Sequence, residues 1–174
     1  MYGTQYMSLG AADIQRRVSA ELVTLQQRLD TPRLWSVAAR LMTLYAKMFP
    51  GSDGAKAVHW YRMAAKAADA SDDLDTRVWV RGRAAIALGY EGAALPVADV
   101  FADQAMAISD RPSLGLVNAV FGKAHAAALR GDHTAARRLL AEGRRSPSAP
   151  STPGTSRRST SRAPWSRCSP GGTY

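Results

Sequence analysis

The aromatic and arginine residues in the middle of the chain are the ones best suited to binding. Trp35, Trp60 and Trp79 offer large apolar surfaces. Arg77 and Arg81 are four residues apart, so they share a helical face and can pair with a carboxylate or a phosphate. We therefore expect these five residues to anchor a ligand or partner groove. Two alternatives stay open: the tryptophans form an aromatic core between helices, and the arginines pair with neighbouring aspartates (Asp72, Asp73, Asp75).

The residues that catalysis, phosphate binding or metal binding requires do not form a recognisable set. Residues 51–56 place glycines before a lysine, but they lack the spacing, the following hydroxyl residue and the preceding strand of a phosphate loop. Asp99 and Asp103 can share a face for acid–base work, although a solvated helix surface is the simpler explanation. The histidines do not cluster by spacing: His59, His125 and His133. The sequence therefore predicts no enzyme, no metal and no cofactor.

Length and composition are those of a globular protein. The chain has 174 residues, of which 46% are hydrophobic, so it suits one domain or a short helical array. No apolar run approaches the roughly 20 residues of a membrane span, and the first ten residues do not form a secretory signal. The single cysteine, Cys168, cannot form an internal disulfide. We expect a cytoplasmic protein that does not bind membranes.

The chain changes character after residue 145. Ser, Thr, Pro and Gly make up 20 of the last 29 residues, and this stretch has four arginines and no acidic residue. The sequence thus predicts a helical repeat domain over 1–145 and a disordered tail over 146–174. The tail is either a basic linker or the product of reading GC-rich DNA out of frame. The abrupt end of the helical pattern favours the second explanation.

Helical periodicity runs through residues 1–145, and no segment alternates for long enough to be a strand. Ile14, Val18 and Leu22 mark one face of the first helix. Turn residues then separate seven expected helices, of which the third spans about 55–70, the fifth about 94–109 and the seventh about 134–145. Among the side chains expected to face inward are three in the second, fourth and sixth helices: Val37, Leu74 and Phe121. Helix caps are expected at Thr31, at 71–73 and at Asp110.

The turns recur at a regular interval. Gly51, Gly89 and Gly131 lie 38 and 42 residues apart, so one period holds two helices. This spacing predicts an array of helical hairpins, and glycines inside the helices, such as Gly82 and Gly122, then let the two helices of a hairpin approach closely. The open alternative is an irregular alanine-rich bundle whose turns are spaced by chance.

Three phrases, at residues 50–56, 78–84 and 122–126, together with the pattern of small residues over 82–101 and 124–143, carry a resemblance to a known family. From about Leu34 to Arg145 the chain resembles the tetratricopeptide-type region of helix-turn-helix transcription regulators from high-GC bacteria. The resemblance implies an all-α, tetratricopeptide-like solenoid of about seven helices. In such regulators the repeats are thought to sense a peptide or protein, or to dimerise.

Two departures from that family accompany the resemblance. Only about ten residues precede the first helix, so the helix-turn-helix DNA reader is expected to be absent or encoded upstream. No capping helix is expected after the seventh, so Leu139 and Leu140 should be partly open and should favour homo-oligomers. We expect a peptide- or protein-binding module of a transcriptional regulator. The alternative is a nucleic-acid-binding protein that acts through its arginines and basic tail, since the formal net charge is +9.

Overall fold

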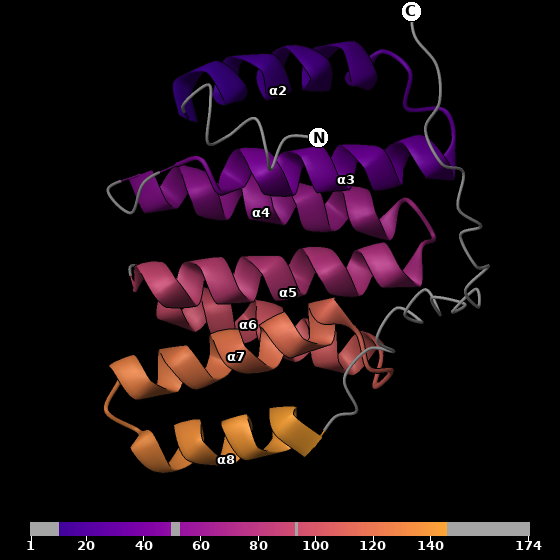
Figure 1. Ribbon diagram of the computed structural model, residues 1–174. Coiled ribbons are helices and arrows are strands. Elements are labelled where there is room, and N and C mark those ends of the chain that lie inside the picture. The colour runs from indigo at the N-terminus through magenta and orange to yellow at the C-terminus, as the bar shows by residue number, and fades with distance from the viewer. Residues whose placement is uncertain (1–10, 50–52, 93, 146–174) are drawn as a thin grey trace, which may run out of the picture.

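The computed structural model describes residues 11–49, 53–92 and 94–145 of the chain, and this part is all-α (Figure 1). It contains seven helices and no strand, as the periodicity predicted. The predicted tail over 146–174 lies outside the described residues. The helices are α2 (Ala11–Gln26), α3 (Pro32–Ala46), α4 (Gly54–Asp69), α5 (Leu74–Glu91), α6 (Leu95–Ile108), α7 (Leu114–Leu129) and α8 (His133–Arg145).

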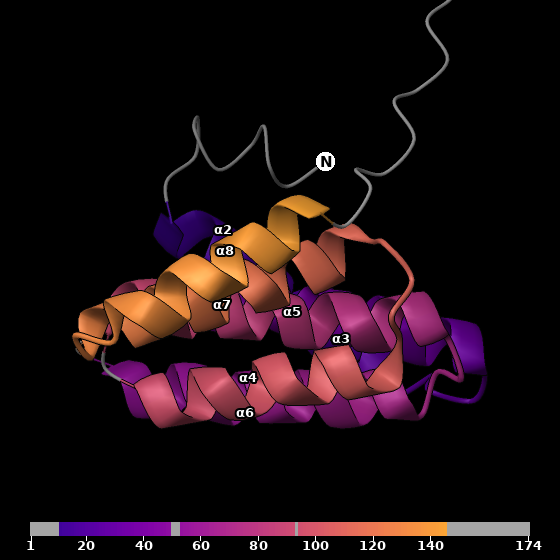
Figure 2. The same ribbon diagram turned by 90° about the horizontal axis from the view of Figure 1, so that it is seen from below.

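Consecutive helices pair into hairpins that stack in two rows. In Figure 2, α4 and α6 form one row, and α3, α5 and α7 form the row beside it. The most extensive contact in the described part is between α5 and α7, which are neighbours in the second row. The last helix, α8, packs mainly on α7 and lies on the side of α7 away from α6. Stacked hairpins of this kind create grooves between helices of the same row.

Side-chain caps mark the starts of three helices. At α8 the Asp132 carboxylate accepts from the backbone N–H of Ala135 at 2.9 Å. Asp73 caps α5: its Oδ1 accepts from the backbone N–H of Asp75 at 3.1 Å and of Thr76 at 3.3 Å. This confirms the cap predicted at 71–73. At α7 the prediction was wrong, because the cap is Ser113 rather than Asp110. The Ser113 hydroxyl accepts from the N–H of Leu116 at 3.2 Å, a bond that the residue just before the helix can make and Asp110 cannot.

The start of α3 follows a different rule. Pro32 occupies the first helical position, where its missing N–H costs nothing. Thr31 precedes it in an extended conformation, but its side chain makes no capping hydrogen bond. Proline therefore marks this helix start without help from the predicted threonine cap.

Gly89 lies inside α5, although the sequence suggested a turn there. The helix continues to Glu91 and ends at Gly92, whose φ of 72° is the left-handed conformation that glycine tolerates. Gly89 instead faces α7, where a Cβ on Gly89 would lie 2.8 Å from the carbonyl oxygen of Gly122. A Cβ on Gly82 would overlap the carbonyl oxygen of Gly115 in the same way. These close approaches join α5 to α7, which belong to successive hairpins, and not the two helices of one hairpin as predicted.

Small residues dominate the core. Of the residues that are less than 3% exposed, most are alanines, and Tyr61, Ile14 and Leu88 are the largest side chains among them. Three side chains that were expected to face inward are instead 37–43% exposed: Val37, Leu74 and Phe121. Leu139 is 8% exposed because α8 turns it onto Val120 and Ala124 of α7, so the expectation of an open Leu139 was also wrong.

Candidate functional site

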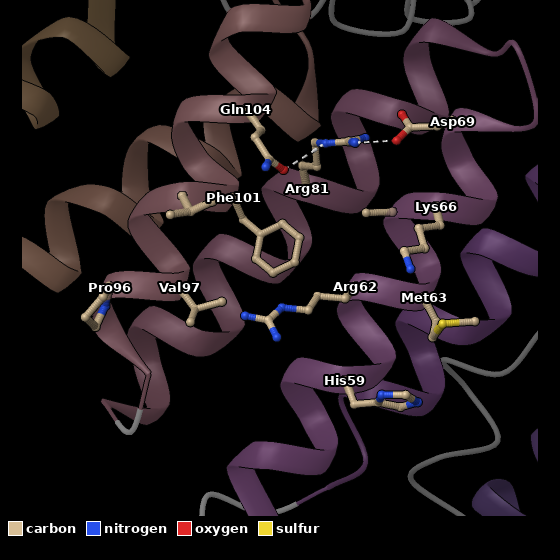
Figure 3. A pocket seen from close by; sticks show the side chains of 12 residues that line it. His59, Arg62, Met63, Lys66, Asp69, Arg81, Pro96, Val97, Phe101 and Gln104 are labelled. Atoms are coloured by element: carbon tan, nitrogen blue, oxygen red, sulfur yellow. Dashed lines mark hydrogen bonds and ion pairs between the residues drawn. The ribbon is translucent and has the colours of Figure 1, made fainter.

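A groove of about 500 Å³ lies between α4 and α6 (Figure 3). One wall is a row of α4 side chains that includes two basic residues, at the helical spacing that places them on one face: His59, Arg62, Met63 and Lys66. All four are exposed. The core side of α4 carries Tyr61, Ala64 and Ala68, so burial of that side directs the basic row outward into the groove.

The opposite wall belongs to α6 and is apolar. Pro96, Val97 and Val100 follow one another along it, and Val100 is 53% exposed. Phe101 closes the floor and is 4% exposed, with its ring set edge-on to that of Tyr61 at 6.5 Å between centroids. One wall of the groove is therefore cationic and the other hydrophobic.

A buried arginine forms one end of this groove. The side chain of Arg81 is 9% exposed and donates to Asp69 of α4 at 2.7 Å and to Gln104 of α6 at 3.2 Å (Figure 3). It also donates to the carbonyl oxygen of Arg77 at 3.3 Å. Arg81, on α5, thus links α4 to α6 at this end of the groove.

Asp69 is held in its charged form. Its partial burial alone would raise the pKa, but the hydrogen bonds and charges of Arg81 and Arg77 outweigh that effect and lower the pKa below its usual range. Arg77 donates to the other carboxylate oxygen of Asp69 at 3.0 Å. Both carboxylate oxygens of Asp69 thus accept hydrogen bonds from arginines, and the positive charge of Arg81 is compensated within the fold.

Arg62 and Lys66 differ from Arg81 because neither forms an ion pair with another described residue. The Arg62 guanidinium extends across the groove toward Val97 and Phe101 (Figure 3). With Arg81 they supply three positive charges to the groove lining, against the single negative charge of Asp69. The surplus is available to an acidic group of a partner, and the α6 wall is available to apolar side chains.

The structure brings together two of the five predicted site residues. Arg77 and Arg81 share Asp69, as their spacing on one face suggested. Their acidic partner is Asp69 at the end of α4 and not Asp72, Asp73 or Asp75. Of the five, only Arg81 lines the α4–α6 groove.

The three tryptophans lie apart from that groove, and all are half-buried against the core. Trp35 belongs to α3 and packs against the core. Trp60 sets its ring edge-on to that of Tyr45, with 4.7 Å between centroids. Trp79 lines a separate pocket of about 220 Å³ and lies under the Arg40 guanidinium, which is 5.4 Å from its ring centroid. Since Trp79 and Arg81 are two residues apart on a helix, they face different sides.

The two aspartates considered for acid–base work hold α6 to α7. Asp99 forms an ion pair with Arg130, with 2.8 Å between Oδ2 and Nη1, and Asp103 pairs with Lys123. Each carboxylate therefore has a cationic partner within the fold. No group of His, Cys, Asp and Glu in the described part of the chain is arranged to hold a metal ion. None of the helices in that part has the length and apolar run needed to cross a bilayer.

Sequence reasoning missed the groove because its two walls come from different hairpins. The signal on α4 was present: His59, Arg62, Met63 and Lys66 repeat at helical spacing opposite the core positions. The apolar residues of α6 that line the groove were not singled out from the sequence, and only the packing shows that Val100 is exposed. In comparisons with known proteins, no family model, curated protein or solved structure matches this chain.

Proposed function

We propose that this protein is a peptide- or protein-binding helical repeat module and that the α4–α6 groove holds the partner segment. One observation carries the proposal: an unpaired basic wall, with Arg62 and Lys66, faces an apolar wall, with Val97 and Val100, across a buried floor. Such a pair of walls complements a segment with an acidic row beside an apolar row. The volume of about 500 Å³ is in the range of known binding sites.

The setting that we propose for this binding is a bacterial transcriptional regulator. The resemblance of residues 34–145 to the tetratricopeptide-type region of such regulators supports a sensing or oligomerising role. The partner is then a peptide, another protein or a second copy of this chain. Among the described residues, Arg77, Arg81 and Arg130 are paired to acidic residues of the same chain, so these three arginines do not support the alternative of nucleic-acid binding.

Two labelled helical peptides test the proposal. Both carry leucines along one face; the first has glutamates on the adjacent face and the second has lysines there. Fluorescence anisotropy should show binding of the acidic peptide and little binding of the basic one. Replacing both Arg62 and Lys66 by alanine should weaken binding of the acidic peptide by about three- to tenfold, as expected for two partly exposed charge pairs.

A matched pair of variants locates the binding site. Val100→Asp places a carboxylate in the apolar wall and should reduce binding of the acidic peptide more than tenfold. Val23→Asp makes the same change at an equally exposed valine of α2, outside the groove, and should leave binding unchanged. Equal binding of both peptides, or equal effects of the two valine changes, would refute the assignment of this groove.

A further inference from the structure

A second pocket, which shares no lining residue with the α4–α6 groove, lies between α5, α7 and α8. Its volume is about 420 Å³. Alanines on the facing sides of α7 and α8 leave this space open: Ala124, Ala128 and Ala136. No Asp, Glu, Lys or Arg is among the lining residues, so a charged ligand would lose its hydration without gaining a partner charge.

Aromatic rings form much of this pocket. The rings of Tyr90 and His125 are stacked, with centroids 4.4 Å apart and planes 15° from parallel. Phe121 lies one turn before His125 on α7 and also lines the space. Tyr90 is 69% exposed, so its ring has a face that the fold leaves uncovered. Flat aromatic ligands suit such a lining.

The hydrogen bond of His125 determines what its ring can offer a ligand. Nδ1 lies 3.0 Å from the carbonyl oxygen of Gly89, and a carbonyl oxygen only accepts, so Nδ1 carries the proton and donates. Gly89 is in the last turn of α5, where carbonyl groups lack partners within the helix. In the neutral ring Nε2 is then a hydrogen-bond acceptor. It has no hydrogen-bond partner among the described residues.

We propose that this pocket binds a small, neutral aromatic molecule with one hydrogen-bond donor, of the phenol or indole class. The ligand ring packs beside Tyr90 and Phe121, and its O–H or N–H donates to Nε2 of His125. An aromatic molecule without a donor leaves Nε2 unpaired when water is displaced from the pocket, and this lowers its affinity. The site is independent of the proposed peptide groove.

Indole and 1-methylindole are the probes for this proposal, because they differ in a single N–H donor. With ¹⁵N-labelled histidine, NMR at a pH where the imidazole is neutral should show the Nδ1–H tautomer for His125 in the free protein. Indole should shift the Nε2 resonance of His125 and bind about three- to tenfold more tightly than 1-methylindole, the range for one net hydrogen bond. An Nε2–H tautomer, or equal affinity for the two compounds, would overturn the proposal.

Two variants test whether indole occupies this pocket. Tyr90→Ala removes an exposed ring and should weaken indole binding at least threefold without unfolding the protein, while Ala128→Phe fills the space and should abolish it. Val100→Asp, in the other groove, is the control and should leave indole binding unchanged. The assignment fails if Tyr90→Ala has no effect in a protein whose circular dichroism is normal.

Discussion

Arg81 lines the α4–α6 groove, but its hydrogen bonds join three helices and so stabilise the fold. Its side chain is 9% exposed, and its guanidinium has three hydrogen-bond acceptors, on α4, α5 and α6. Arg77 shares its carboxylate partner but has a side chain that is 37% exposed. From the sequence alone, we expected the two arginines to be equivalent anchors for a ligand or partner. Their different burial makes Arg81 a structural residue at the end of the groove.

Replacing Arg81 should therefore reduce stability as well as any binding. Arg81→Ala leaves the side-chain oxygen of Gln104 and one carboxylate oxygen of Asp69 without their donor, and we expect the free energy of unfolding to fall by about 1–3 kcal/mol. Arg77→Ala removes a more exposed pair and should cost about 1 kcal/mol or less. Urea denaturation measures both. Equal losses for the two variants would contradict the distinction.

The contact between α5 and α7 depends on glycines spaced two turns apart on each helix. A Cβ on Gly115 would lie 2.7 Å from the backbone nitrogen of Trp79, and one on Gly122 would lie 2.6 Å from that of Ile86. Backbone atoms cannot move aside as a flexible side chain can. Glycine is therefore required here so that the helices can approach, even though it disfavours the helical conformation.

Gly82→Ala should destabilise the protein although alanine is the better helix former. The new methyl group meets the Gly115 carbonyl, so α5 and α7 must separate, at an expected cost of about 1–3 kcal/mol. Gly143→Ala is the control: its methyl group meets only the side chain of Val120, at 3.1 Å, and the change should stay below about 1 kcal/mol. Thermal unfolding of both variants checks this. A stabilised Gly82→Ala protein would mean that the close contact does not exist.

Acidic residues distributed over several helices make the stability of the whole molecule depend on pH. Asp73 accepts a hydrogen bond from the Thr76 hydroxyl at 2.6 Å, which is the main cause of its lowered pKa, and Ser36 of α3 donates to the same carboxylate at 3.3 Å. The pKa of Asp69 is also lowered. Burial raises the pKa of Glu91, which acts in the opposite direction but on a single group.

The free energy of unfolding should fall as the pH drops below the ordinary carboxylate range of about 4. A lowered folded-state pKa means that the unfolded chain takes up protons first, so the stabilisation present above that range is lost on acidification. Asp73→Asn keeps a capping oxygen but removes the titrating group. Urea midpoints at neutral and acidic pH should therefore differ less for this variant than for the unchanged protein. An undiminished difference would show that Asp73 does not contribute to the acid sensitivity.

Local patterns in the sequence determined the class of fold. Apolar spacing predicted seven helices, and turn residues and the cap at 71–73 placed several of their ends, because these features depend on neighbours within a few residues. The prediction failed at Gly89, where a glycine that looks like a turn residue lies inside α5. A glycine required by packing and one required by a turn are identical in sequence.

Contacts between hairpins determined the sites, and these are decided only by tertiary structure. Trp79 and Arg81 looked like one binding set but face different sides of α5, whereas Arg62 and Val100, 38 residues apart, face one groove. The acceptor at Nε2 of His125 likewise depends on the Gly89 carbonyl, 36 residues away. Periodicity specifies which side of a helix is buried, but the neighbour that covers it, and the space left between them, depend on how side chains from distant segments pack.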